Sequence, residues 1–221
     1  MKTTTYTNEK AFDSEISGHR STSEIIQKRC LTALIGVAIC FLVNLVLRVD
    51  YILLGNQIGE LSLTEMLEQL MLIISAGSFY WLVKTQPTLK HAAVLVGTFF
   101  LVILIRENDA FFDYISHGFW LYPALVATFT ALVYATRNGK QTLDQLVVIL
   151  SASYMNMLIW GVIMLLVYSR LFGMGSFWHG VMGEHYVRDV KNIAEEGSEL
   201  LAYCIIAFSS FKIQRQFKAA R

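Results

Sequence analysis

Charge is scarce in this sequence: Asp, Glu, Lys and Arg make up 16% of its 221 residues, whereas a soluble domain carries about a quarter. Proline is scarcer still, at two residues, and the three cysteines show none of the spacings that bind metals. Catalytic signatures such as HExxH, GxSxG, Walker A and CxxC are absent. Hydrophobic residues, in contrast, make up 55% of the chain, and its mean hydropathy is +0.49. The composition disfavours a soluble protein, and we expect a lipid bilayer and no nucleic acid as partner.

Six apolar segments are each long enough to cross a bilayer, which takes roughly 20 mostly apolar residues. The third is short, and the second and sixth contain glutamates. The sequence therefore predicts an all-α fold, a polytopic membrane helix bundle with six transmembrane helices. A four-helix soluble bundle is the alternative, but the first, third and fifth segments are apolar all round, which disfavours it. The predicted spans are 30–49, 64–83, 91–106, 117–136, 146–168 and 193–213.

The chain divides into a polar N-terminal stretch, 1–29, and a transmembrane domain, 30–221. The stretch is rich in Thr, Ser, Glu and Lys and has no apolar core of its own. We expect a disordered cytoplasmic tail that ends in a short amphipathic helix over Ser21–Arg29. A cleavable signal peptide would have its apolar stretch close to the N-terminus, followed by small residues. Neither is present, so the first apolar segment is predicted to be a retained signal-anchor.

Lysine and arginine counts predict the orientation, because cytoplasmic loops are enriched in these residues. If the six segments cross the membrane in turn, 13 of the 18 basic residues lie on the side of both termini. We therefore predict cytoplasmic N- and C-termini in a multi-pass protein of the cell (inner) membrane. The opposite side holds the other five basic residues: Arg48, Arg106, Arg170, Arg188 and Lys191.

Two glutamates open the second segment. Ser62 and Glu65 have the spacing of a capping box, in which Ser62 accepts a hydrogen bond from the Glu65 amide and Glu65 reaches back. Glu65 therefore has a structural explanation. Glu68 lies one turn deeper, where an ionised carboxylate is costly unless it is paired or faces water. The position of Glu68 favours a polar interior or a site.

The connection between the third and fourth segments contains Arg106, Glu107, Asp109, Asp113 and His117. Asp109 has the residue type of a helix N-cap. Asp113 and His117 are four residues apart and would share one face of a helix. An interfacial turn with aromatic anchors and local ion pairs explains the same pattern, so both interpretations stay open.

Two further features interrupt the predicted helices. Pro123 falls inside the fourth segment, where it removes a backbone hydrogen bond and should kink the helix near Phe119. The connection after the fifth segment is rich in glycine and aromatic residues and contains His179 and His185. We expect it to be a flexible or re-entrant segment at the membrane surface.

The sixth segment carries a polar stripe whose members recur at spacings of four, three and four residues. At about 100° per residue they fall on one face of a helix. Such a stripe faces a bundle interior or a watery cavity rather than lipid. Interhelical pairing, for instance of Glu199 with Arg106, explains it as well as a working site does. The stripe consists of Arg188, Asn192, Glu195 and Glu199.

Together these residues predict one polar site that opens to the non-cytoplasmic side. Imidazole and carboxylate are the usual zinc and iron ligands, so a divalent metal is a possible cofactor. Its predicted ligands are Asp113, His117, His179, His185 and Glu195. The wider candidate site consists of Glu68, Arg106, Glu107, Asp109, Asp113, His117, Arg188, Asn192, Glu195 and Glu199.

Two classes of function fit these features. The first is a non-enzymatic bundle: a transporter-like protein that binds ions or protons, or an assembly partner in a membrane complex or homo-oligomer. The second is an intramembrane enzyme, with or without a metal, that acts on a lipid or lipid-linked substrate. We favour the first, because no catalytic motif is present.

Overall fold

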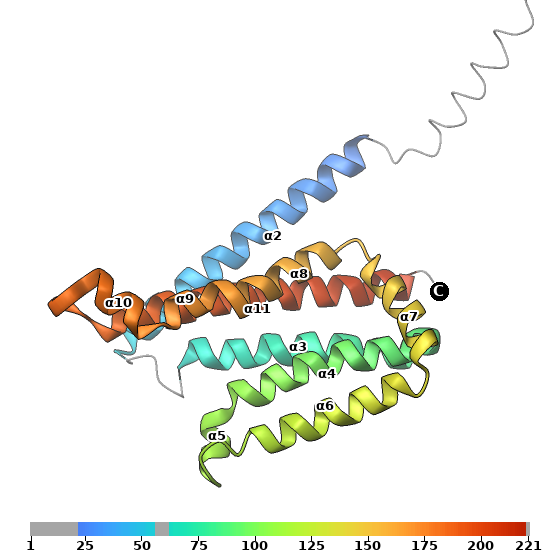
Figure 1. Cartoon of the computed structure of the whole chain (residues 1–221). Helices are drawn as coiled ribbons and strands as arrows, with labels where there is room; N and C mark the ends of the chain where they lie inside the picture. Colours follow the sequence, from blue (N-terminus) through green and yellow to red (C-terminus); the bar gives the residue numbers. More distant parts are fainter. Residues whose placement is uncertain (1–21, 56–61, 220–221) are drawn as a thin grey trace, which may run out of the picture. The chain divides into compact units, whose positions relative to one another are not determined.

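The computed structural model describes residues 22–55 and 62–219, and every regular element in these ranges is a helix (Figure 1). The predicted all-α class is confirmed. The chain divides into two compact units, Met1–Leu42 and Val43–Arg221. Most of the predicted tail, 1–21, lies outside the described residues, whereas residues 22–29 already belong to the first described helix. The helix thus begins before the predicted start of the first span.

The long helices are linked by short helical turns. α2 continues into the π-helix η1, and α8, η3 and α9 follow one another without a break. The elements are α2 (Thr22–Arg48), η1 (Val49–Leu53), α3 (Leu63–Thr85), η2 (Pro87–Leu89), α4 (Lys90–Glu107), α5 (Asp109–Asp113), α6 (Leu121–Thr136), α7 (Gly139–Leu150), α8 (Met155–Ile163), η3 (Met164–Tyr168), α9 (Ser169–Gly173), α10 (Gly175–Met182), η4 (Gly183–His185) and α11 (Arg188–Ala219).

Four helical stretches of the described chain are long and apolar enough to cross a membrane, which indicates a membrane protein. They are Ser23–Leu53, Leu63–Thr85, Pro87–Glu107 and Met155–Gly173. α6 is equally apolar but has only 16 residues. α11 has 32 residues but is not one of these four stretches, because it contains many charged side chains.

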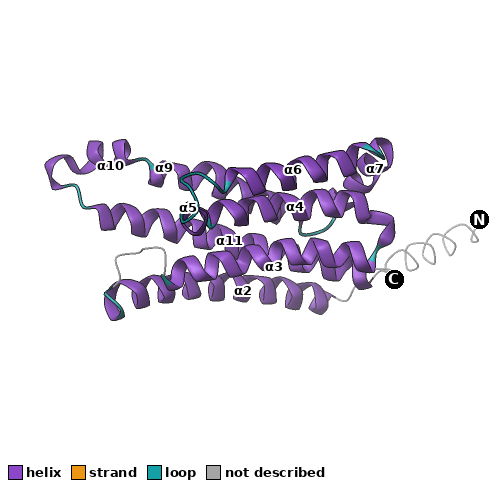
Figure 2. Ribbon diagram, turned by 90° about the horizontal axis from the view of Figure 1, so that it is seen from below, coloured by secondary structure: helices purple, strands orange, loops and turns teal. Residues whose placement is uncertain are grey.

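Within the second unit the helices pack side by side. α11 lies between α3 and the α8–α9 stretch, and α4 lies between α3 and α6 (Figure 1). Figure 2 shows α3, α4, α6 and α11 running along a common direction. The hydrophobic core of the unit includes Leu72, Phe79, Phe100, Tyr203 and Ile206, all of which are buried. Apolar packing between neighbouring helices therefore holds the unit together.

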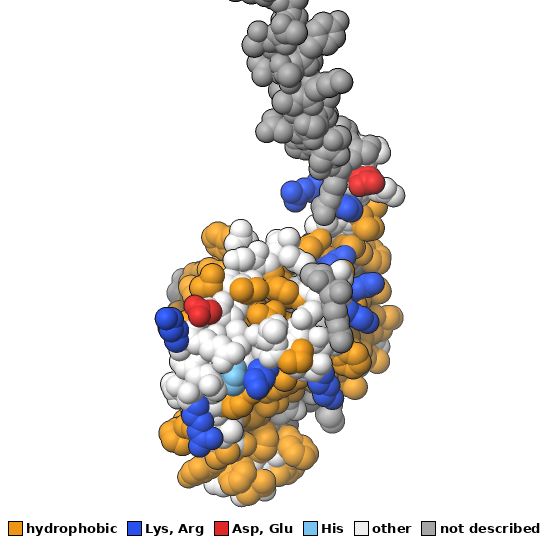
Figure 3. Space-filling view, turned by 90° about the vertical axis from the view of Figure 1, so that its right-hand side faces the viewer, with side chains coloured by type: hydrophobic (Ala, Val, Ile, Leu, Met, Phe, Trp, Pro, Cys, Tyr) orange, Lys and Arg blue, Asp and Glu red, His pale blue; other side chains and the backbone are white. Residues whose placement is uncertain are grey.

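One end of this unit carries most of its basic residues, and we call it the basic end. Gln86 donates to the carbonyl of Phe217 over 2.8 Å there, and the Gln145 side chain accepts from the amide of His91 over 2.9 Å. These bonds tie the α3–α4 connection to α11 and α7. Figure 3 shows Lys and Arg side chains around this end. Its exposed basic residues include Lys84, Lys90, Arg137, Lys140, Arg215 and Lys218.

The predicted kink at Pro123 is wrong. α6 begins only at Leu121, so Pro123 is its third residue, and residues 114–120 form turns instead of helix. The first residues of a helix have no intrahelical partner for their N–H groups. Proline is therefore tolerated at this position and breaks no hydrogen bond.

The predicted fifth span, 146–168, is also placed wrongly. The helix breaks at residues 151–154, and the apolar stretch that could cross a membrane is Met155–Gly173. At the break, the backbone N–H of Ser153 donates to the Gln216 side chain over 3.0 Å. A side chain of α11 thus replaces an intrahelical acceptor, which the apolar pattern of the sequence does not reveal.

Candidate functional site

The candidate site is positioned by the first turn of α3. Asp50 is completely buried and accepts three hydrogen bonds: from the amides of Leu63 and Thr64, over 3.0 and 2.9 Å, and from the Thr64 hydroxyl, over 2.5 Å. Ser62 accepts from the Glu65 amide over 3.2 Å, which confirms the serine half of the predicted capping box. The two caps fix the start of α3.

Three carboxylates from three helices converge below this cap. They belong to Glu68 on α3, Glu107 at the end of α4 and Glu199 on α11, and one oxygen of each lies within 4.8 Å of the others. Glu68 is 3% exposed. Within residues 22–55 and 62–219, its Oε1 atom is buried and has no hydrogen-bond partner. We call these three residues the carboxylate cluster.

Glu107 is held from two directions. Arg106, its neighbour in the chain, forms an ion pair with the Oε1 atom. The hydroxyl of Tyr203 donates to the same oxygen over 2.7 Å. Tyr203 is completely buried on α11, one turn after Glu199, so this bond joins α4 to α11 at the cluster. The Arg106 side chain is 36% exposed and links the cluster to the surface.

Glu199 is held by the α8–α9 stretch. The buried hydroxyl of Ser169 donates to its Oε1 atom over 3.0 Å, and Arg170 Nη2 lies 3.9 Å from the same atom. Ser169 follows η3, a π-helical turn inside an otherwise α-helical stretch. Such turns change the phase of a helix and are frequent at functional sites. Here the turn immediately precedes the two residues that contact Glu199.

The electrostatic balance of the cluster is negative. When ionised, three carboxylates face two guanidinium groups, those of Arg106 and Arg170. Buried charge is costly unless it is paired. Glu68 has neither a hydrogen bond nor an ion pair in the described part of the chain, and it is the most deeply buried of the three. The cluster is therefore suited to a positively charged ligand.

The other predicted residues lie apart from this cluster. Asp113 accepts from the Gly118 amide over 2.8 Å and pairs with His117 over 2.9 Å. The backbone N–H of Gly118, and then His117, hold the pKa of Asp113 below the ordinary aspartate value. The pair is solvent-exposed, and the His117 side chain is 98% exposed. Asp109 is also exposed, at the start of α5.

Only one member of the predicted stripe reaches the cluster. Glu195 pairs with Lys191 on its own helix over 2.5 Å, Asn192 is half-buried, and Arg188 is exposed. Glu199 accepts a hydrogen bond from another helix and joins the cluster, as the stripe predicted for its inner end. The Glu195 carboxylate lies against Gly173 of α9 but is not part of the cluster. The stripe is therefore a real face of α11, but its outer residues do not join the cluster.

The predicted metal ligands do not converge. His179 stacks on Tyr186 with 4.0 Å between ring centroids, and His185 is exposed in η4. Across the described ranges, the carboxylate cluster is the one group of three or more acidic, histidine or cysteine side chains whose ligand atoms converge. Residue spacing predicts which side chains share one face of a helix, but it does not predict how α10 and η4 lie relative to α5. The five residues in question are Asp113, His117, His179, His185 and Glu195.

Three residues that position the carboxylate cluster were not predicted from the sequence: Asp50, Ser169 and Tyr203. Asp50 stands at the end of an apolar segment, and only the fold brings it to the start of α3. Tyr203 had a signal, because it follows Glu199 by four residues and extends the same face of α11. Nothing in the sequence marks Ser169 as part of a site, since a lone serine in an apolar segment is common in membrane helices.

No family model, curated protein or solved structure matches this chain. The function proposed below is therefore argued from the chemistry of the cluster. Carboxylate oxygens are hard ligands that bind hard cations. In the described residues no histidine or cysteine converges with the three glutamates, and the serine that contacts them, Ser169, donates its hydroxyl to Glu199. The arrangement resembles a set of oxygen ligands more than an activated nucleophile beside a base.

Proposed function

We propose that this chain is a transporter-type membrane bundle that binds one divalent cation at Glu68, Glu107 and Glu199. One observation carries the proposal: a carboxylate oxygen of Glu68 is buried without a partner where two other carboxylates converge. Ionisable residues inside membrane bundles commonly mark ion pathways. The unpaired Oε1 atom of Glu68 is therefore the oxygen that we expect to contact the cation.

The spacing of the oxygens fits a hard cation. Calcium binds oxygen at 2.3–2.6 Å, so two ligands on opposite sides of one ion lie about 4.6 to 5.2 Å apart. The oxygens of the carboxylate cluster lie within 4.8 Å of one another. Calcium, magnesium and manganese all prefer carboxylate oxygen, and a divalent ion would neutralise the excess negative charge.

Arg106 and Arg170 allow the cluster to release its cation, because they compensate negative charge when the site is empty. Each guanidinium lies beside one of the carboxylates, Arg106 at Glu107 and Arg170 at Glu199. When the ion leaves, these side chains compensate two of the three negative charges. The cluster then exchanges its cation without leaving all of its charge buried and unpaired, as a transport site must.

The proposal includes six membrane crossings, with α6 and α11 as the fourth and sixth. α11 tolerates charge because Glu199 and Tyr203 are buried against other helices instead of facing lipid. The basic end carries Lys84, Lys90 and Arg137 and faces the cytoplasm under the positive-inside rule, as do both termini. The cluster then lies near the non-cytoplasmic side of the cell (inner) membrane.

Manganese binding to the purified full chain, followed by electron paramagnetic resonance, tests the proposal, with calcium and magnesium as competitors. We expect one ion per chain and at least a tenfold loss of affinity in Glu68→Gln, since one of three charged ligands is neutralised. His117→Ala is the matched control, because His117 is exposed and outside the cluster. Binding that survives Glu68→Gln, or that disappears in His117→Ala, would contradict the proposed site.

Uptake of manganese into proteoliposomes tests the transport part separately. We expect uptake by the wild-type chain and the His117→Ala variant and none by Glu68→Gln. Binding without uptake would assign the cluster to an assembly partner in a complex or homo-oligomer, which is the other non-enzymatic role.

A further inference from the structure

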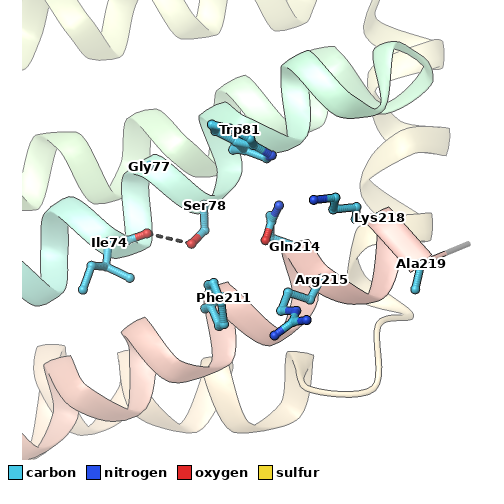
Figure 4. Close-up of a pocket in the computed structure, with 9 residues that line it drawn as sticks. All are labelled: Ile74, Gly77, Ser78, Trp81, Phe211, Gln214, Arg215, Lys218 and Ala219. Atoms are coloured by element: carbon cyan, nitrogen blue, oxygen red, sulfur yellow. Dashed lines mark hydrogen bonds between the residues drawn. The ribbon is translucent and has the colours of Figure 1, made fainter. Parts of the chain in front are cut away.

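A cavity lies at the end of α3 and α11 that is opposite the carboxylate cluster. It lies between the C-terminal half of α3 and the last turns of α11 and has a volume of about 810 Å³ (Figure 4). Ligand pockets typically enclose about 300–1,000 Å³. Glu68 precedes Trp81 of this cavity by 13 residues of one helix, roughly 20 Å. The cavity is therefore distinct from the carboxylate cluster.

One part of the cavity is apolar. Ile74 and Trp81 on α3 face Phe211 on α11, and all three are exposed large hydrophobic residues. Gly77 lies between the two α3 side chains, and a Cβ atom added there would meet nothing within 4 Å. The absence of a side chain at Gly77 keeps this wall open. The wall is suited to an acyl chain.

The other part of the cavity is cationic. Arg215 and Lys218 are three residues apart on α11 and line the cavity beyond Phe211 (Figure 4). The Arg215 guanidinium lies 5.7 Å from the centre of the Phe211 ring, a cation–π contact that holds it over the apolar wall. Both cations are exposed, and neither has an ion pair with any residue in 22–55 or 62–219.

We propose that this cavity binds an anionic phospholipid, with its phosphate at Arg215 and Lys218 and an acyl chain along Ile74, Gly77 and Phe211. Two cations beside an apolar wall complement a phosphate joined to a hydrocarbon chain. Basic pockets between membrane helices on the cytoplasmic side bind anionic headgroups in this way. The inference does not depend on the carboxylate cluster binding a cation.

Native mass spectrometry of the full chain, with phosphatidylglycerol or phosphatidylcholine added, tests the proposal. We expect preferential retention of phosphatidylglycerol, and about 30-fold weaker binding when Arg215→Gln and Lys218→Gln are combined. Arg137→Gln with Lys140→Gln is the matched control, since both residues are exposed at the basic end but do not line the cavity. Equal weakening in both pairs would overturn the proposal, because it would reflect overall surface charge.

Gly77→Leu tests the apolar wall without changing charge. A leucine has room in the open cavity and favours helix, so the fold is retained. We expect at least a fivefold loss of bound phosphatidylglycerol, with no loss of stability against unfolding in lipid-free detergent. Unchanged lipid retention in Gly77→Leu, displacement of the lipid by inorganic phosphate, or a dimer that forms without lipid and dissociates in Arg215→Gln with Lys218→Gln would each overturn the proposal.

Discussion

The hydroxyl of Tyr203 donates to the Oε1 atom of Glu107 over 2.7 Å and joins the middle of α11 to the end of α4. α3 lies between these two helices in the packing order. The bond therefore links α11 to α4 directly at the carboxylate cluster, to which α3 contributes Glu68. It also orients the one oxygen of Glu107 that pairs with Arg106.

Removal of this bond tests its contribution to stability. Tyr203→Phe keeps the buried ring and leaves the Glu107 oxygen without its hydroxyl donor. Because hydrogen bonds to charged groups are the stronger ones, we expect a loss of roughly 2 kcal/mol in the free energy of unfolding. Denaturation in detergent measures it, and Tyr122→Phe, at an exposed tyrosine, is the control. An equal effect of both changes would show that the hydroxyl bond is not stabilising.

Asp50 supplies the cap on which the position of Glu68 depends. Asp50→Ala removes an acceptor of two amides and one hydroxyl at the start of α3. We expect about 2 kcal/mol of destabilisation and faster hydrogen exchange at the Leu63 and Thr64 amides. Asp144→Ala, at an exposed position of α7, should change neither quantity. Unchanged exchange at Thr64 in Asp50→Ala would contradict the capping role.

A bound cation should stabilise the folded chain through Glu199. A ligand at 100 times its Kd adds about 2.7 kcal/mol to the stability of the state that binds it. Manganese should therefore raise the unfolding temperature of the wild-type chain and of Glu184→Gln, at an exposed residue of η4. Glu199→Gln should lose this increase, because one ligand of the cluster is neutral. An identical increase in all three chains would place the ion elsewhere.

The six-span topology predicts opposite sides for the two ends of α6. In a chain whose three cysteines are replaced by serine, Ser116→Cys and Asn138→Cys place one exposed thiol before and one after this helix. An impermeant maleimide applied to intact cells should label Ser116→Cys. Asn138→Cys should react only after permeabilisation. Labelling of both from the outside would mean that α6 does not cross the membrane.

The Asp113 turn predicts a local pH dependence. Its carboxylate accepts from the Gly118 amide, and its pKa lies below the ordinary aspartate value. A lowered pKa means that the turn is stabilised at pH values above the ordinary value and loses this stabilisation as pH falls through the lowered one. The Gly118 amide shift in an NMR titration should follow that ionisation. In Asp113→Asn the chemical shift of the Gly118 amide should not change with pH over the range in which Asp113 ionises.

Helix type was predictable from local pattern, but two boundaries were not. Apolar length identified α3 and α4 closely, because a membrane span needs a continuous apolar run whatever it packs against. The sequence is compatible with Pro123 either in the middle of a helix or in its first turn. Pro123 lies in the first turn because residues 114–120 form turns and α6 begins only at Leu121. The break at 151–154 depends on Gln216, 63 residues away from Ser153.

The sequence by itself determined that the chain is helical and apolar and that Glu68 and Glu199 need partners, because burial of a carboxylate in a membrane helix is costly wherever it lies. The tertiary structure alone decided which partners they meet. Glu107, Asp113 and His117 were all predicted as members of one candidate site, but Glu107 joins the two glutamates whereas the exposed pair Asp113 and His117 does not. Helix spacing defines a face within one helix, but the packing of α3, α4 and α11 decides which faces meet.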